Sequence, residues 1–80
     1  MTSEDIERRV IRTVAEQFCE PEDKITRETH IENDLHGDSL DAVELVMELE
    51  DEFDLPITDE DAEKLKTVGD AVDYLVERLN

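Results

Sequence analysis

Ser39 is the side chain of this sequence that is best placed to take part in chemistry. It follows Gly37 and Asp38, and an apolar pattern typical of a helix begins at about this point. A serine hydroxyl close to an imidazole, here that of His36, suggests a nucleophile and its base. The segment lacks the second glycine of a nucleophile elbow, however, and no oxyanion site is evident, so hydrolase activity is disfavoured. A plainer alternative is that Asp38 or Ser39 only caps a helix.

Carboxylates are the most abundant reactive groups in the chain. No stretch has the spacing of a calcium-binding EF-hand loop, because a loop starting at Asp34 would need glycine at Ser39 and glutamate at Leu45. Cys19 is the only cysteine, so an internal disulfide and a cysteine metal site are both excluded. We therefore expect no dedicated metal site. Loose binding of divalent ions, which would relieve charge repulsion, remains the weakest of the alternatives.

The net charge of the chain points to basic protein partners. There are 25 acidic and 8 basic residues, which give a formal charge of −17. Such a chain should repel nucleic acid and anionic membranes, and it should remain monomeric. No signal peptide is recognisable, and no apolar run approaches the roughly 20 residues that span a bilayer. We therefore expect a cytoplasmic protein that does not insert into membranes.

Apolar residues recur at helical spacing in four segments. They predict a first helix over residues 3–18, a second from residue 38 or 39 to about 53, a short third helix from a cap at residue 58 to about 65, and a last helix over residues 68–79. The long connection over residues 20–38 should be held to the core by Ile25, Ile31 and Leu35.

No alternating pattern typical of strands competes with these helices. The predicted fold is therefore all-α, a compact four-helix bundle with three longer helices, one short helix and a long first loop. Eighty residues make a single domain, residues 1–80, and leave no room for a large catalytic cavity. Any function should therefore use the surface or an added group.

The second helix has two apolar rows. The first row is centred on Ala42, is predicted to be buried, and continues through Leu45, Val46, Leu49 and Phe53. The second row, which lies about a third of a turn or more away, consists of Leu40, Val43 and Met47. Two interpretations of the second row stay open. It is either part of a wide core face or an exposed strip, rimmed by acids, that binds a partner.

The charge pattern around this helix favours a partner. Residues 28 to 63 include 15 acids and no lysine or arginine. Within the helix several acids are three or four residues apart, a spacing that costs about 0.2–0.5 kcal/mol per like-charged pair. An element that accepts this cost is suited to guiding basic partners electrostatically, an effect that acts mainly on the association rate.

The segment around Ser39 also resembles a known family. DLHGDSLD (residues 34–41) is similar to the D-L-G-x-D-S-L-D segment of acyl carrier proteins. VELVM (43–47), LEDEF (49–53), DEDAEK (59–64), TV (67–68) and DAVDY (70–74) continue the likeness. The resemblance extends over almost the whole chain, and it is closest to the stand-alone carriers of dissociated fatty-acid synthases. It implies that residues 1–80 form one acyl carrier domain without catalytic activity.

The resemblance also assigns a cofactor and the residue that carries it. Ser39 would be the attachment serine, to which a phosphopantetheinyl transferase adds 4′-phosphopantetheine from coenzyme A with Mg²⁺. Acyl chains would then be held as thioesters on the terminal thiol, for enzymes of fatty-acid biosynthesis. Asp38 would cap the helix and assist recognition by the transferase. A helix N-terminus, with its free N–H groups and positive dipole end, suits the resulting phosphodiester.

Two surfaces follow from the same resemblance. Acyl-processing enzymes with basic patches would contact a partner face made of Leu40, Val43, Glu44, Met47, Glu48, Glu50 and Asp51. The acyl chain would fold into a pocket between the helices, lined by Leu45, Val46, Leu49, Leu65 and Val72.

Two departures from the family pattern keep other functions open. His36 and Gly37 stand where the family usually has glycine and then a small or apolar residue, and Cys19 lies where glycine is common. A carrier in a polyketide or another specialised acyl pathway is therefore an alternative to fatty-acid biosynthesis. An unmodified acidic module that binds proteins is a further alternative.

Overall fold

The computed structural model describes residues 2–35 and 39–79, the side chain of Ser39 excepted. Its elements, in chain order, are α1 (Ser3–Phe18), the short 3₁₀ helix η1 (Glu22–Lys24), α2 (Ser39–Phe53), α3 (Asp59–Ala62) and α4 (Val68–Leu79). The predicted all-α fold with three longer helices and one short helix is confirmed. The 3₁₀ helix in the first loop was not predicted.

Local hydrogen bonds fix both ends of α1 where the sequence predicts them. The hydroxyl of Thr2 accepts a hydrogen bond from the backbone N–H of Asp5 at 3.1 Å, which caps the start of the helix. At the other end Cys19 adopts a left-handed backbone conformation with φ of 56°. This lets the N–H of Glu20 donate to the carbonyl of Ala15 at 3.0 Å. Glycine adopts this conformation more easily, so cysteine here carries some backbone strain.

The short helix α3 ends earlier than predicted, at Ala62 rather than near Leu65. The N–H groups of Lys64 and Leu65 donate to carbonyls only three residues back, so the chain tightens into turns. The carbonyl of Lys66 then accepts a hydrogen bond from the N–H of Ile31 at 2.9 Å. The N–H of Lys66 donates to the carboxylate of Asp70 at 3.1 Å, so it caps the start of α4 and does not extend α3.

The first loop is joined to the start of α4 by backbone contacts that were not predicted. His30 and Thr67 form an isolated antiparallel bridge. Beside it, the N–H of Gly69 donates to the carbonyl of Arg27 at 2.8 Å. A Cβ atom on residue 69 would lie 3.0 Å from that same oxygen. The close approach of the two segments therefore favours glycine at this position.

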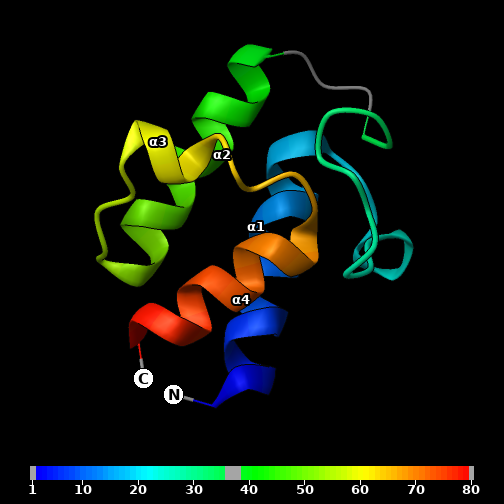
Figure 1. The fold of residues 1–80 in the computed structure, drawn as a ribbon. Coiled ribbons are helices and arrows are strands. Elements are labelled where there is room, and N and C mark those ends of the chain that lie inside the picture. Colours follow the sequence, from blue (N-terminus) through cyan, green and yellow to red (C-terminus); the bar gives the residue numbers. More distant parts are fainter. Residues whose placement is uncertain (1, 36–38, 80) are drawn as a thin grey trace.

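Helices α1, α2 and α4 enclose the core, and the first loop and α3 lie on opposite sides of it (Figure 1). The three predicted loop anchors, Ile25, Ile31 and Leu35, are buried as expected. The rest of the buried apolar core consists of Ile6, Val10, Val14, Ala15, Leu45, Leu49, Phe53, Ile57, Val68, Ala71, Val72 and Leu75. Over the described residues, no helix has the length and apolar character needed to cross a membrane.

Candidate functional site

Ser39 is the first residue of α2, as the sequence predicts. The N–H groups of a helix's first turn have no partner within the helix, and the helix dipole makes this end positive. The backbone around Ser39 is therefore suited to holding a negatively charged group. Asp38, Gly37 and His36 lie outside the described residues, so the predicted cap at Asp38 has no structural counterpart here.

The second apolar row of α2 lies on the surface. The exposed fractions of Leu40, Val43 and Met47 are 63%, 55% and 58%, and these three are the large apolar side chains exposed in the described part of the chain. The interpretation of this row as a wide core face is therefore wrong. It is an apolar strip that begins one residue after Ser39 and continues along α2 for two turns.

Three of the predicted partner-face acids are exposed beside this strip, namely Glu44, Glu48 and Asp51. The carboxylate of Glu44 also accepts a hydrogen bond from the side-chain amide of Gln17 at 3.0 Å, a contact between α2 and α1. An exposed apolar row with acids beside it has the composition of a protein-binding surface that excludes acidic partners.

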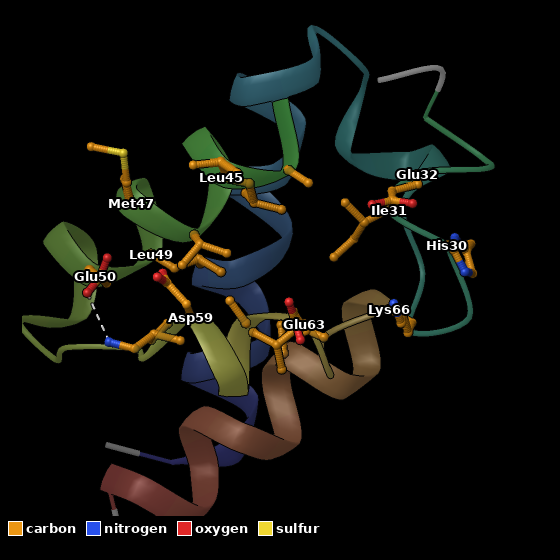
Figure 2. Close-up of a pocket in the computed structure, with 17 residues that line it drawn as sticks. His30, Ile31, Glu32, Leu45, Met47, Leu49, Glu50, Asp59, Glu63 and Lys66 are labelled. Atoms are coloured by element: carbon orange, nitrogen blue, oxygen red, sulfur yellow. Dashed lines mark hydrogen bonds between the residues drawn. The ribbon is translucent and has the colours of Figure 1, made fainter. Parts of the chain in front are cut away.

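Glu50 differs from the other predicted partner-face acids. Its side chain is half-buried, and its carboxylate accepts a hydrogen bond from the backbone N–H of Ile57 at 2.9 Å (Figure 2). The sequence placed Glu50 on the partner face because its spacing puts it beside the apolar strip. Glu50 therefore also holds the segment that returns after Pro56, and its place on the partner face stays a prediction.

A pocket of about 540 Å³, partly open to solvent, lies between α2 and the segment over residues 57–66. Figure 2 shows Leu45 and Leu49 of α2 facing it on one side, with Asp59 and Glu63 on the other and Ile31 from the first loop. Four of the five side chains predicted for an acyl pocket line it, namely Leu45, Val46, Leu49 and Leu65.

The fifth predicted pocket residue, Val72, does not line this pocket. Val72 is buried in the core, and the preceding residue, Ala71, reaches the pocket instead. Consecutive residues on a helix point about 100° apart, and here Ala71 is on the side of α4 that borders the pocket whereas Val72 is turned away from it. Both belong to the same apolar stripe in the sequence, and periodicity alone does not separate them.

Sequence reasoning also missed lining residues outside α2. Ile31, Ile57 and Ala62 contribute apolar surface. Of these three, only Ile31 was predicted to lie in the core, as an anchor of the first loop. At one end of the pocket the lining is polar and consists of His30, Glu32, Glu63 and Lys66 (Figure 2).

Asp61 joins the short helix α3 to α4. Its carboxylate accepts hydrogen bonds from the Tyr74 hydroxyl at 2.9 Å and from the Arg78 guanidinium at 3.1 Å. The guanidinium also lies 4.8 Å from the centre of the Tyr74 ring, a cation–π contact. Burial, and next the hydrogen bond to Asp61, raise the pKa of Tyr74 above its ordinary value. Tyr74 is half-buried, and the contact of its hydroxyl with Asp61 was not predicted.

A second arginine, Arg27, joins three elements away from the pocket. Its guanidinium donates to Asp73 of α4 at 2.7 Å and to Glu7 of α1 at 3.0 Å. The hydrogen bond to Asp73, followed by that to Glu7, raises the pKa of Arg27 above its ordinary value. Arg27 is in the first loop, so this pair of contacts ties the loop to α1 and α4.

Glu52 of α2 pairs with α1. Its carboxylate lies 3.4 Å from the Arg9 guanidinium and 3.8 Å from that of Arg12. The acids of α2 therefore divide into an exposed group and one that pairs within the bundle. Among the residues that the structure describes, no group of three or more histidine, cysteine or acidic side chains is arranged to hold a metal ion.

Comparisons with known proteins agree with this geometry. The family model described as a phosphopantetheine attachment site matches residues 8–75. An acyl carrier protein of Lactobacillus johnsonii is 49% identical over 80 residues, which is the full length of both chains. A solved structure of the acyl carrier protein from Enterococcus faecalis, studied for its high thermal stability, has a TM-score of 0.80 and 45% identity, and the match covers 96% of this chain and 98% of that one. The chain belongs to the acyl carrier protein family.

Proposed function

We propose that Ser39 carries 4′-phosphopantetheine and that acyl intermediates of fatty-acid biosynthesis are held as thioesters on the thiol of this arm. One observation carries the assignment. The matched attachment-site model covers residues 8–75, and Ser39 is the sole serine within them, because the only other serine is Ser3. The protein is a carrier and not an enzyme, so the chemistry occurs on its partners.

The position of Ser39 fits a phosphodiester. The residue opens a helix of 15 residues, and the positive dipole end of a helix stabilises a negative group. In a chain with a net charge of −17 this is one of the few places where the backbone offsets an added negative charge. When bound, the cofactor supplies a flexible arm and a thiol, and the protein supplies the attachment point and the surfaces around it.

The pocket between α2 and residues 57–66 is the proposed site for the acyl chain. Its apolar lining includes Leu45, Val46, Leu49 and Leu65, as predicted, with Ala71 in the place expected for Val72. Burying a saturated chain against such side chains gains about 0.8 kcal/mol per methylene. Val43 and Met47, which are exposed on α2, also border the pocket, so its mouth lies on the same face as the apolar strip.

The exposed strip of α2 is the proposed docking face for the phosphopantetheinyl transferase and for acyl-processing enzymes with basic patches. Leu40, Val43 and Met47 supply an apolar centre, and Glu44, Glu48 and Asp51 supply exposed charge. Because the strip starts beside Ser39, a partner seated on it would have its active site near the arm. The same surface would serve a polyketide or another specialised acyl pathway, or an unmodified interaction module in the cytoplasm.

Modification in vitro tests the proposal. The purified protein is incubated with coenzyme A, Mg²⁺ and a broad-specificity phosphopantetheinyl transferase, and the intact mass is recorded. Ser39→Ala is the test variant, and Ser3→Ala, which removes the other serine, is the matched control. We expect the parent and Ser3→Ala to gain one phosphopantetheine each and Ser39→Ala to gain none. No gain from a folded parent protein would favour the unmodified interaction module.

A further inference from the structure

One wall of the pocket is a strap, residues 57–66, that is fixed at both ends. At its start Ile57 is buried and its N–H donates to the carboxylate of Glu50. At its end the carbonyl of Lys66 accepts from the N–H of Ile31 at 2.9 Å. Both anchors use the backbone of the strap, and each ties it to a different element, α2 or the first loop.

The middle of the strap is held differently. It contains α3, a single turn of helix in which none of the residues is buried. Asp59 and Glu60 are exposed, whereas Ala62 packs partly against the core. Hydrophobic burial therefore holds this part of the wall weakly, although Asp59, Ala62 and Glu63 line the pocket.

The polar contacts of Asp61 attach the middle of the strap to α4, where hydrophobic burial holds it only weakly. The side chain of Asp61 is only 22% exposed, and it accepts from both Tyr74 and Arg78. Hydrogen bonds to a charged, partly sheltered carboxylate are stronger than those between neutral groups. Tyr74 and Arg78 lie on α4 outside the pocket lining, so they act on the pocket only through the position of α3.

We propose that Tyr74 and Arg78, through Asp61, set how closely the strap approaches α2 and thereby set the longest acyl chain that the pocket encloses. This inference rests on the proposed acyl-carrier function of the pocket. Tyr74 and Arg78 are positioning residues in this role, because they touch α3 and not the chain. We call the hydrogen bonds of Tyr74 and Arg78 to Asp61 the clamp. When the clamp is weakened, the middle of the strap can move away from α2 between its two anchors, and the space against Leu45 and Leu49 becomes longer or wider.

The test measures how well the protein shields thioesters of graded length. Holo-protein is loaded with saturated acyl groups from butyryl to palmitoyl, and the rate of thioester cleavage by hydroxylamine is measured for each. Each methylene that enters the pocket should slow cleavage about fourfold, and methylenes beyond the enclosed length should have no further effect. The length at which protection levels off is therefore the readout.

Two variants and one control isolate the clamp. Tyr74→Phe/Arg78→Met removes both donors and leaves every pocket-lining residue unchanged, and Tyr74→Phe alone is the milder version. Arg27→Met is the matched control, since it also removes two carboxylate contacts to elements that include α4, but at a site away from the pocket. We expect protection to level off at a longer chain in both clamp variants and at the parent length in the control.

The possible outcomes distinguish a failure of this inference from a failure of the proposed acyl-carrier function on which it rests. An unchanged levelling length in the clamp variants would overturn the role of Asp61, Tyr74 and Arg78, and so would an equal shift in Arg27→Met. Absence of any mass gain on modification, or cleavage rates of the parent that do not depend on chain length, would instead refute the proposed function itself. If only Tyr74→Phe folds, it carries the same test with a smaller expected shift.

Discussion

Leu49→Ala offers a test of the proposed acyl pocket in which stability and ligand binding are measured together. Leu49 is 1% exposed and also lines the pocket. Truncating such a leucine costs about 2–5 kcal/mol, from lost transfer energy and the cavity left behind. An 80-residue domain has a total stability of about 4–12 kcal/mol, so the loss is a large fraction of it. The melting temperature should fall by at least about 8 °C.

The new void would be continuous with the pocket, and this makes the loss partly reversible. An acyl chain on the arm can enter the space of the three carbon atoms that leave with the leucine side chain. It should restore up to about 2 kcal/mol, the transfer energy of a group of that size. The increase in melting temperature on octanoylation should therefore be larger for Leu49→Ala than for the parent protein.

Leu75→Ala is the matched control for this prediction. Leu75 is also 1% exposed, but it lies on α4 and does not line the pocket. Its truncation should destabilise the protein by a similar amount, and the acyl chain should not reach the void. Thermal unfolding of the holo and octanoyl forms, followed by circular dichroism, gives the comparison. Equal octanoyl increments in the two variants would refute the assignment of this pocket to the acyl chain.

Three further predictions concern charge, packing and pH. Glu48→Lys should lower the rate of association with the transferase, and the difference in rate from the parent protein should shrink at high salt because exposed charges are screened. Stopped-flow measurements that show no change in the association rate would contradict electrostatic guidance of partners by the acids of α2. Gly69→Ala should lower the melting temperature although alanine favours a helix by about 1 kcal/mol, because its Cβ would lie 3.0 Å from the Arg27 carbonyl oxygen, and such overpacking costs about 1–3 kcal/mol. A raised melting temperature would show that the first loop shifts enough to accommodate the added Cβ atom. The pKa of Tyr74 is raised above its ordinary 10.0 by burial and by Asp61, so the hydroxyl of Tyr74 in the folded protein should lose its proton only above that pH. The stability that this shift contributes is complete below the pKa of the unfolded tyrosine and is lost as pH rises through the folded value. Tyr74 is the only tyrosine, so an absorbance titration reports it alone, and ionisation at or below the ordinary value would refute the role of the contact.

Most helix boundaries were predictable because local interactions determine them. The start of α1 depends on Thr2 and the N–H of Asp5, three residues away, and the starts and ends of α2 and α4 follow apolar periodicity. The resemblance around Ser39 was sufficient to predict the family, which the comparisons then confirmed.

The candidate site was only partly predictable, because its details depend on segments that are distant in sequence. Periodicity identified two apolar rows on α2, but the exposure of Leu40, Val43 and Met47 is a property of the bundle. Glu50 was predicted for the partner face, and only the tertiary structure shows that it also accepts a hydrogen bond from the backbone N–H of Ile57.

By itself, therefore, the sequence determined the helices, the family and the serine proposed for attachment, since these depend on residues within a few positions of one another. The tertiary structure decided which groups meet across long separations. It joined the first loop to the Lys66 carbonyl, it set Ala71 rather than Val72 against the pocket, and it brought Tyr74 and Arg78 to Asp61. Each of these contacts needs a partner that approaches only when the bundle has formed, and a local pattern does not encode that approach.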